Sequence, residues 1–243
     1  MTTSPHDYLA LWWHGDVRLP LDDAITWARR QRLLPLLRWR ARKEGWTLPK
    51  ALMQAIDHNQ MVTALNQALV RRQLAAIEQI ADALDIPIVL VKGAAVATAY
   101  PEPWMRPFGD IDLLIQSEAM TGFLAAMTEL GYTPTAWAAG RQTRHYPPLM
   151  PPGEGVPVEV HTAMSREHGR VRFDLRQWEA NLEPLPDFPG IWAPGQHDHL
   201  VYIAYHATVH HDLLMGLHPY ADLGFLSETW TKPDWERAVE IAE

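Results

Sequence analysis

Apolar residues recur at steps of three and four along one long stretch, from about Pro49 to Leu84. They are Leu52, Ile56, Val62, Leu65, Leu69, Leu74, Ile77, Ile80 and Leu84. This spacing matches the 3.6-residue period of an amphipathic helix. An earlier segment, Leu21–Arg30, begins with acids and ends with bases, an order that complements the helix dipole. The pattern therefore predicts a helical N-terminal region over residues 1–84.

A different pattern begins at Ile86. The run Ile86–Val91 is apolar and rich in β-branched residues, which is typical of a buried strand. A Lys92-Gly93 turn and the helix-favouring segment Ala94–Tyr100 follow it. A second strand is predicted over Asp110–Gln116, and a helix over Glu118–Leu130. This alternation of strand and helix predicts an α/β (α+β) fold with a small mixed sheet.

Two later segments complete the pattern. Val156–His161 alternates apolar and polar residues, so it predicts a strand with valines on one face and Glu159 and His161 on the other. From about Pro194 the chain is predicted to be helical, and it is rich in histidine. We therefore expect three regions: an N-terminal helical region (1–84), a core (85–165) and a C-terminal helical region (166–243).

Two carboxylates open the second predicted strand. Asp110 and Asp112 are separated by one residue, so they share a strand face with Cα atoms about 6.5–7 Å apart. Carboxylate oxygens suit magnesium, manganese or calcium, and two such acids can converge on one or two divalent ions. The alternative is that this acidic triplet ends a loop and is solvated.

The Lys92-Gly93 turn predicts an anion site. Backbone N–H groups at a helix N-terminus and the positive end of the helix dipole both attract phosphate. Lys92 adds a full positive charge at the same place. A phosphate site beside a two-carboxylate metal site is the combination that phosphoryl or nucleotidyl transfer requires.

Glu159 lies on a strand expected next to the one that carries Asp112. This position suits a third metal ligand or a general base. The alternative is an exposed acid on an edge strand. His161 shares the face of Glu159, where it could orient Glu159, contact a nucleotide or make a structural hydrogen bond.

The run Lys92–Ile115 resembles the DNA-polymerase-β-like nucleotidyltransferase superfamily, and within it an uncharacterised bacterial nucleotidyltransferase family. The elements that carry the resemblance are Lys92-Gly93, Tyr100-Pro101, Arg106 and Asp110-Ile111-Asp112-Leu113-Leu114. Ala94 departs from the wider superfamily, in which serine or glycine follows the first glycine. The Glu159–His161 element also fits the family, as does a helix at Tyr202–His211 that precedes Asp222.

The resemblance implies a small mixed sheet of nucleotidyltransferase type, flanked by N-terminal and C-terminal helical regions. It implies a metal-dependent enzyme that moves a nucleoside monophosphate from an NTP, with ATP expected first, to an acceptor hydroxyl and releases pyrophosphate. Asp110, Asp112 and Glu159 would be catalytic and would hold Mg²⁺ or Mn²⁺. The expected nucleotide-binding residues are Lys92, Gly93, Arg106 and His161. The helix at Tyr202–His211 would form one wall of the nucleotide or acceptor pocket.

Two alternatives remain open at this point. The Ala94 departure and the early end of the helical C-terminal region fit a nucleotide-binding or scaffold protein that has the same fold but no turnover. His206 and His210 lie four residues apart on a predicted helix, next to His211. Such histidines can share a metal ion, as they would in a metal phosphohydrolase.

Composition narrows the expected partners and compartment. The net charge of −8 leaves no basic surface for a long nucleic acid, and the absence of cysteine excludes disulfides and a thiolate nucleophile. The N-terminus lacks the pattern of a secretion signal, and no apolar run reaches the length of a membrane span. We therefore expect a cytoplasmic protein. The early end of the C-terminal helices leaves room for a protein partner.

Overall fold

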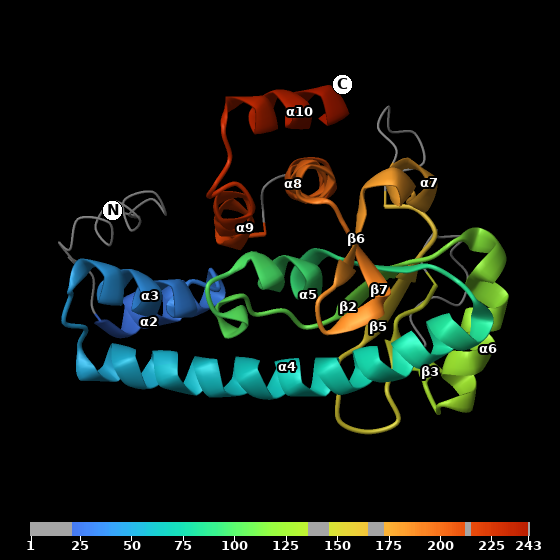
Figure 1. The fold of residues 1–243 in the computed structure, drawn as a ribbon. Helices are drawn as coiled ribbons and strands as arrows, with labels where there is room; N and C mark the ends of the chain where they lie inside the picture. Colours follow the sequence, from blue (N-terminus) through green and yellow to red (C-terminus); the bar gives the residue numbers. More distant parts are fainter. Residues whose placement is uncertain (1–20, 136–145, 165–172, 212–214, 243) are drawn as a thin grey trace.

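The computed structural model describes residues 21–135, 146–164, 173–211 and 215–242 (Figure 1). The helices are α2 (Leu21–Arg30), α3 (Leu34–Glu44), α4 (Lys50–Leu84), α5 (Lys92–Val96), α6 (Met120–Glu129), α7 (Leu175–Trp178), α8 (Gln196–Tyr205), α9 (His218–Leu226) and α10 (Lys232–Ala242). Short helical turns are η1 (Ala97–Ala99), η2 (Pro103–Met105), η3 (Ser117–Ala119), η5 (Glu179–Asn181) and the π-helical η6 (His206–His210). The strands are β1 (Ile88–Val91), β2 (Ile111–Leu114), β3 (Thr133–Pro134), β4 (Leu149–Met150), β5 (Val158–His161), β6 (Leu182–Leu185) and β7 (Phe188–Pro194).

These strands form one mixed sheet in the order β3-β4-β5-β2-β1-β7-β6. Strand β1 pairs antiparallel with β2, and β2 pairs parallel with β5. All four residues of β1 and of β2 are buried, because helices cover both faces of the sheet. The predicted α/β (α+β) class with a mixed sheet and flanking helices is confirmed.

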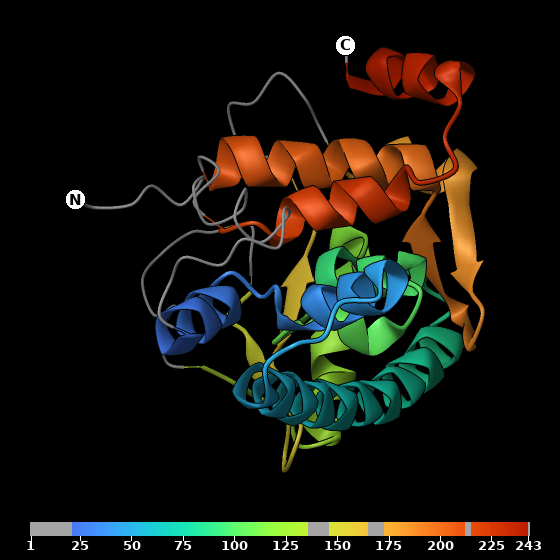
Figure 2. The same ribbon diagram turned by 90° about the vertical axis from the view of Figure 1, so that its left-hand side faces the viewer.

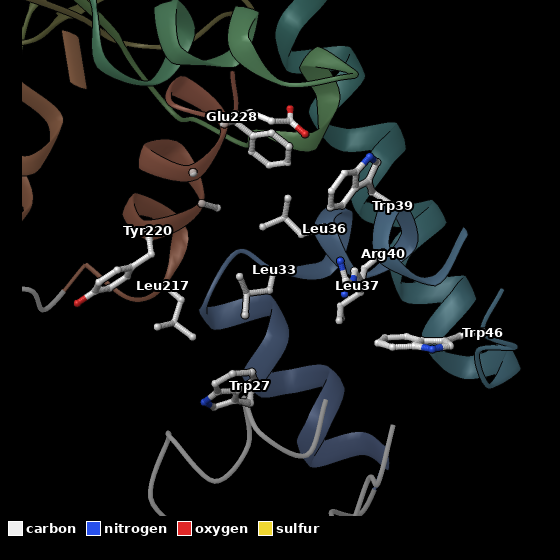
Figure 3. A pocket seen from close by; sticks show the side chains of 13 residues that line it. Trp27, Leu33, Leu36, Leu37, Trp39, Arg40, Trp46, Leu217, Tyr220 and Glu228 are labelled. Carbon is white, nitrogen blue, oxygen red and sulfur yellow. The ribbon is translucent and has the colours of Figure 1, made fainter. Parts of the chain in front are cut away.

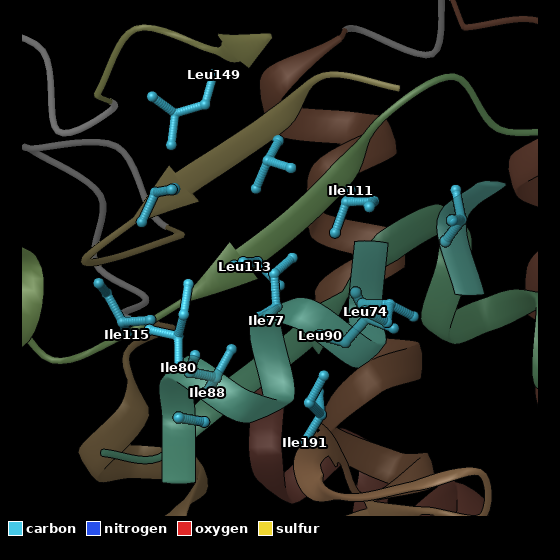
Figure 4. Close-up of a cluster of buried hydrophobic side chains, with 14 of the residues drawn as sticks. Leu74, Ile77, Ile80, Ile88, Leu90, Ile111, Leu113, Ile115, Leu149 and Ile191 are labelled. Carbon is cyan, nitrogen blue, oxygen red and sulfur yellow. The ribbon is translucent and has the colours of Figure 1, made fainter. Parts of the chain in front are cut away.

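One face of the sheet packs against α4 and α6. Figure 4 shows Leu74 and Ile77 of α4 beside Leu90, Ile111 and Leu113 of the central strands. All of these side chains are at most 5% exposed. The helix predicted over Pro49–Leu84 is confirmed as α4, and its C-terminal half supplies the core on this face.

The apolar stripe of α4 is not buried along its whole length. Val62 and Leu65, which the periodicity assigned to the buried face, are 42% and 59% exposed. The N-terminal third of α4 packs against α2 and α3, whereas its C-terminal half packs against the sheet. At this point of α4 the side that faces the protein carries Thr63, which is 4% exposed. Val62 and Leu65 lie about 100° and about 200° around the helix from Thr63, so they face away from the protein.

The opposite face of the sheet packs against the C-terminal helices. Figures 1 and 2 place α8 and α9 on the side of the sheet away from α4. Tyr202 of α8 is fully buried, and its ring contacts those of Phe173 and Trp178. Val89 and Leu114 of the sheet belong to the same core. This is the face on which the polar site lies.

Strands β6 and β7 were not predicted, and they lie in a region that we expected to be helical. They extend the sheet, because β7 pairs parallel with β1 at Ile191 and Trp192. Prolines, which usually argue against a strand, recur through this segment at Pro184, Pro186, Pro189 and Pro194. Residues 21–84 contain α2, α3 and α4, and residues 1–20 lie outside the described ranges; the division of the chain into three regions stays a prediction. Within those ranges no helix is both long and apolar enough to cross a membrane.

Candidate active site

Asp112 lies on β2 at the centre of the sheet, and the β2–β5 register places Glu159 directly beside it. In parallel strands, residues in register point to the same face, so the two carboxylates are neighbours. Leu114 and His161 form the register pair two residues further on, on the same face. Ile111 and Leu113 are buried in the opposite core, which confirms the faces predicted from the alternation.

Lys92 follows β1 and opens α5. Its Nζ lies 2.5 Å from Oδ1 of Asp112, and its side chain is 17% exposed. Burial by itself would raise the pKa of the Asp112 carboxyl, but Lys92 and His161 outweigh burial and hold this pKa well below its ordinary value. Asp112 is therefore a carboxylate at neutral pH, as a cation ligand must be.

His161 connects the two acidic strands. Its Nε2 lies 2.9 Å from Oδ1 of Asp112 and 3.7 Å from Oε2 of Glu159, and its side chain is fully buried. The sequence left three roles open to His161. The structure shows one of them, a structural hydrogen bond, which His161 makes with Asp112. A role of His161 in binding nucleotide stays a prediction.

Glu159 is held in a different electrostatic state from Asp112. Burial and the neighbouring charge of Asp112 raise the pKa of Glu159 to about 7, although Lys92 opposes this shift. Its side chain is 32% exposed, so unlike Asp112 it can be reached from solvent. One strand pair thus presents a carboxylate that is charged at neutral pH beside one whose pKa is about 7, a contrast found in sites for acid–base chemistry.

Asp110 lies just before β2 and is half-buried. Burial and the charge of Asp112 raise the pKa of Asp110, while Lys92, Arg32 and Arg106 lower it. In the described part of the chain, the donor atoms close enough to share one ion belong to Asp112, Glu159 and His161. Asp110 is not in this group, so its role as a metal ligand stays a prediction.

The donor set of this group fits a divalent cation. Two carboxylate oxygens suit Mg²⁺ or Mn²⁺, and an imidazole nitrogen beside them suits manganese or other transition metals better than magnesium. The donor atoms all lie within 4.8 Å of one another, which matches the size of a coordination shell. The group therefore fits the kind of metal that the sequence predicted, with His161 as an additional donor.

The Lys92-Gly93 turn is tightly packed. Lys92 has a φ of 55°, in the left-handed region that non-glycine residues rarely adopt. A Cβ atom on Gly93 would lie 2.7 Å from Cβ of Phe108 and 3.2 Å from Nη1 of Arg106, so only glycine fits there. The turn thus brings its backbone and the Lys92 ammonium next to Asp112, Glu159 and His161, which we call the acidic group.

Arg106 lies in a buried ion pair with a C-terminal residue. Its Nε and Nη2 donate to the two carboxylate oxygens of Asp222 at 3.0 and 2.7 Å. The hydroxyl of Tyr100 donates to the same carboxylate at 2.6 Å. The predicted contact between Arg106 and a triphosphate is not tested by this arrangement, but the sequence alone did not reveal that Asp222 is its partner.

The helix predicted to wall the pocket, Tyr202–His211, comprises the last four residues of α8, the turn η6 and the residue that follows it. Burial first, and then the charges of Asp112 and Glu159, raise the pKa of Tyr202. Burial and the charge of Lys92 lower the pKa of His206 to about 3. Tyr202 is therefore within range of the charges of Asp112 and Glu159, and His206 within range of that of Lys92.

The C-terminal histidines pack as rings. The ring centroid of His206 lies 5.2 Å from that of His210 and 4.6 Å from that of His211. In the described ranges, three close metal-donor atoms come together at Asp112, Glu159 and His161 but not among these histidines. The geometry therefore favours the acidic group over the histidine-rich helix as the metal site.

Two buried histidines near Asp222 predict a loss of stability in acid. Burial lowers the pKa of His199 to about 4 and that of His218 to about 4. In the unfolded chain these histidines have a pKa of about 6.5, so they take up protons more readily than in the folded state. The free energy of unfolding is therefore highest above pH 6.5 and falls as the pH drops toward 4. At pH 5 each histidine should lower the free energy of unfolding by about 2 kcal/mol relative to pH 7.5.

Urea unfolding at pH 7.5, 6 and 5 measures this loss. A His199→Gln variant cannot titrate at that position, so its stability should depend less steeply on pH than that of the wild type. Equal slopes for the two proteins would contradict the assignment to His199.

A large cavity lies away from the acids. It has a volume of about 720 Å³ and lies between α2, α3 and α9 (Figure 3). Its walls are mainly apolar and aromatic, with Trp27 and Trp39 from the N-terminal helices and Tyr220 and Phe225 from α9. None of the acidic or nucleotide-binding candidates lines it.

Comparison with known proteins adds a family and a fold. A family model described as an uncharacterised nucleotidyltransferase matches residues 19–243. No curated protein matches the chain in sequence. Among solved structures, ANT(2'')-Ia in complex with adenylyl-2''-tobramycin is similar, with a TM-score of 0.51 and 12% identity over 71% of this chain and 94% of that chain.

Two further solved structures are similar. The solution structure of the antibiotic-resistance factor ANT(2'')-Ia gives a TM-score of 0.50 and 12% identity over 72% of this chain and 89% of that chain. An antigenic nucleotidyltransferase-like protein from Paracoccidioides brasiliensis gives a TM-score of 0.46 and 15% identity, covering 71% of this chain and 86% of that chain. At these identities, the likeness to ANT(2'')-Ia shows a shared fold.

Proposed function

Because the chain belongs to the uncharacterised nucleotidyltransferase family, we propose that it moves a nucleoside monophosphate from an NTP to a hydroxyl group of an acceptor, with release of pyrophosphate. Family membership makes the chain a nucleotidyltransferase enzyme. The donor nucleotide, the acceptor and the metal are the parts that we propose. ATP is the first donor to test.

One observation carries the proposal. Asp112 and Glu159 lie side by side on adjacent strands, and Lys92 at the first turn of α5 reaches the same carboxylate group. The proposed cation site and the proposed polyphosphate site are thus neighbours, where β1 ends and β2 begins. Transfer of a nucleotidyl group requires this pairing, because charge develops on both the metal-bound and the leaving oxygens.

The carboxylates would hold the metal. We assign Asp110, Asp112 and Glu159 to a divalent cation, Mg²⁺ or Mn²⁺, with His161 beside them. When bound, the cation would supply positive charge that stabilises the phosphate oxygens. Lys92 and the backbone N–H groups at Gly93 would hold the triphosphate, since Ala94 offers no hydroxyl for this purpose.

Two side chains of the protein would accept the proton and compensate the charge of the leaving group. Glu159, which is partly exposed, would accept the proton of the acceptor hydroxyl. The acceptor oxygen then forms a bond to the α-phosphorus, and the bond from that phosphorus to the bridging oxygen of the β-phosphate breaks. Pyrophosphate leaves with that oxygen, and Lys92 compensates its charge.

The likeness to ANT(2'')-Ia suggests which donor and acceptor to test. That protein was crystallised with adenylyl-2''-tobramycin, a compound that carries an adenylyl group. Adenylyl transfer to a small hydroxyl-bearing molecule is therefore the first form of the reaction to examine. The overall acidity of the chain, at net charge −8, argues against a long nucleic acid as the acceptor.

Calorimetric titration of the four nucleoside triphosphates, each with Mg²⁺, tests the proposal. We expect metal-dependent binding of one nucleotide to the wild type and its loss in the Asp110→Asn, Asp112→Asn double variant. The matched control is the Asp22→Asn, Asp23→Asn double variant, which removes two neighbouring exposed charges on α2. It should bind the nucleotide like the wild type.

Other outcomes would contradict particular parts of the proposal. If no nucleotide binds to the folded wild type, the nucleotide site is wrong. If a nucleotide binds but no pyrophosphate is released with any hydroxyl acceptor in a screen, the chain is a nucleotide-binding protein without turnover. Binding that survives in the Asp110→Asn, Asp112→Asn double variant would remove these acids from the site.

A further inference from the structure

A buried cluster joins α9 to the core. It consists of Asp222 on α9 and Arg106 and Tyr100 from the segment between β1 and β2, which we call the Asp222 cluster. Asp222 is 1% exposed, Tyr100 is 5% exposed and Arg106 is 6% exposed. Both oxygens of Asp222 accept hydrogen bonds from Arg106, and one of them also accepts from Tyr100. A bidentate pair of this kind fixes the plane of the guanidinium group.

The other edge of that guanidinium group faces the Lys92-Gly93 turn. Nη1 of Arg106 donates to the carbonyl oxygen of Pro107 at 2.9 Å. The same nitrogen lies 3.2 Å from the position that a Cβ atom on Gly93 would occupy. The guanidinium group is therefore packed between Asp222 on one side and the first turn of α5 on the other.

The packed turn in turn places Lys92. Because Lys92 has a left-handed φ of 55°, its conformation costs energy and persists only where the surrounding structure enforces it. Gly93, enclosed by Arg106 and Phe108, supplies part of that constraint. The result is the 2.5 Å contact between Lys92 and Asp112 in the acidic group.

We propose that Asp222 is a positioning residue for the nucleotide site. By orienting Arg106 against Gly93, it holds the Lys92-Gly93 turn in the conformation that presents Lys92 and the α5 backbone to a triphosphate. The part of this inference that concerns nucleotide rests on the proposed function, whereas the part that concerns the turn does not. Arg106 then acts on the triphosphate through Gly93 rather than by direct contact.

This arrangement also links the C-terminal helices to the site. Asp222 reaches Arg106 because α9 lies against the segment between β1 and β2, so in this proposal the docking of α9 helps to hold the turn. Phe225, one turn further along α9, packs on Tyr100 with ring centroids 4.3 Å apart and strengthens the same contact. The proposed positioning role therefore couples the docking of α9 to the geometry of the Lys92-Gly93 turn.

Hydrogen–deuterium exchange of the segment 92–96 tests the inference without any nucleotide. In Asp222→Asn, we expect exchange of this segment to quicken by at least about tenfold, because Arg106 loses its charged partner. Acylation of Lys92, read by mass spectrometry, should quicken as well. Tyr100→Phe retains the ring and the ion pair, so it should give a smaller change in the same direction.

The matched control is Asp198→Asn. Asp198 is also a buried aspartate of the C-terminal helices, 4% exposed, but its partner is Asn181 and not Arg106. If lower global stability were the only cause, Asp198→Asn and Asp222→Asn would each exchange faster in proportion to their own loss of stability. We therefore expect faster exchange at 92–96 only in the Asp222 cluster variants, once global stability is taken into account.

The outcomes separate this inference from the proposed function. Unchanged exchange at 92–96 in Tyr100→Phe and Asp222→Asn, or an equal change in Asp198→Asn, would overturn the positioning role. If Asp222→Asn does not fold, Tyr100→Phe decides. In calorimetry, Asp222→Asn should bind the nucleotide at least about tenfold more weakly than the wild type. A wild type that binds no nucleotide would refute the proposed function, while the exchange result would still decide the role of Asp222.

Discussion

Replacing Asp112 by asparagine is expected to remove both metal binding and a large part of the protein's stability. Nζ of Lys92 and Nε2 of His161 both contact one oxygen of this carboxylate, and their side chains are 17% and 0% exposed. Removing one partner of a buried ion pair costs about 3–5 kcal/mol, because the other charge stays buried without compensation. Affinity for Mn²⁺ should fall by at least about 100-fold, since losing even a residue that only orients a metal ligand costs about 10–100-fold.

Urea unfolding and calorimetric titration with Mn²⁺ measure the two effects. Asp110→Asn is the matched control for stability alone, because Asp110 is itself a proposed metal ligand. Asp110 is half-buried and its pKa is raised, so losing its charge should cost the folded state nothing. We expect the free energy of unfolding of Asp110→Asn to stay within about 0.5 kcal/mol of the wild type. If Asp112→Asn is as stable as Asp110→Asn, Asp112 does not anchor Lys92. If it binds Mn²⁺ like the wild type, Asp112 is not a ligand.

The second large effect is expected at Glu159, where activity and stability should change in opposite directions. Glu159→Gln should lower the rate of nucleotidyl transfer by about 10²–10⁴-fold, the range for loss of a general base. The pKa of Glu159 is raised to about 7, well above the ordinary value for a glutamate. The folded state therefore disfavours its charge, so at pH 8 the variant should be at least as stable as the wild type.

Initial rates of pyrophosphate release and urea unfolding at pH 8 measure these two quantities. Glu183→Gln makes the same chemical change at an exposed position on β6, and it should alter neither of them. A Glu159→Gln variant that transfers at the wild-type rate would remove Glu159 from the reaction. One that is clearly less stable than the wild type would show that Glu159 makes a stabilising contact instead.

Much of the site could be predicted because strand alternation is a local property. The order of apolar and polar residues around Asp112 and Glu159 put both acids on one face, and the structure shows that face as expected. The strand, turn and helix at Ile88–Val96 were likewise readable, since short-range steric and hydrogen-bonding preferences determine them. The family assignment from the residues between Lys92 and Ile115 agrees with the matching family model.

Tertiary structure alone decided the contacts between distant parts of the chain. Arg106 and Asp222 are 116 residues apart, and their pairing depends on where α9 packs, which no local pattern encodes. The same holds for His161, which is 49 residues from Asp112 and could be assigned from the sequence to any of three roles.

Strands β6 and β7 show the same division between local and long-range determinants. Their sequence is poor in strand signals because proline disfavours pairing, yet β1 offers a free edge and β7 adds to it. The sequence by itself therefore determined which acids lie on β2 and β5, which lysine follows β1, and which strand face carries the acids, because periodicity acts over a few residues. Which of these groups meet was decided by long-range packing, in which burial outweighs local preference.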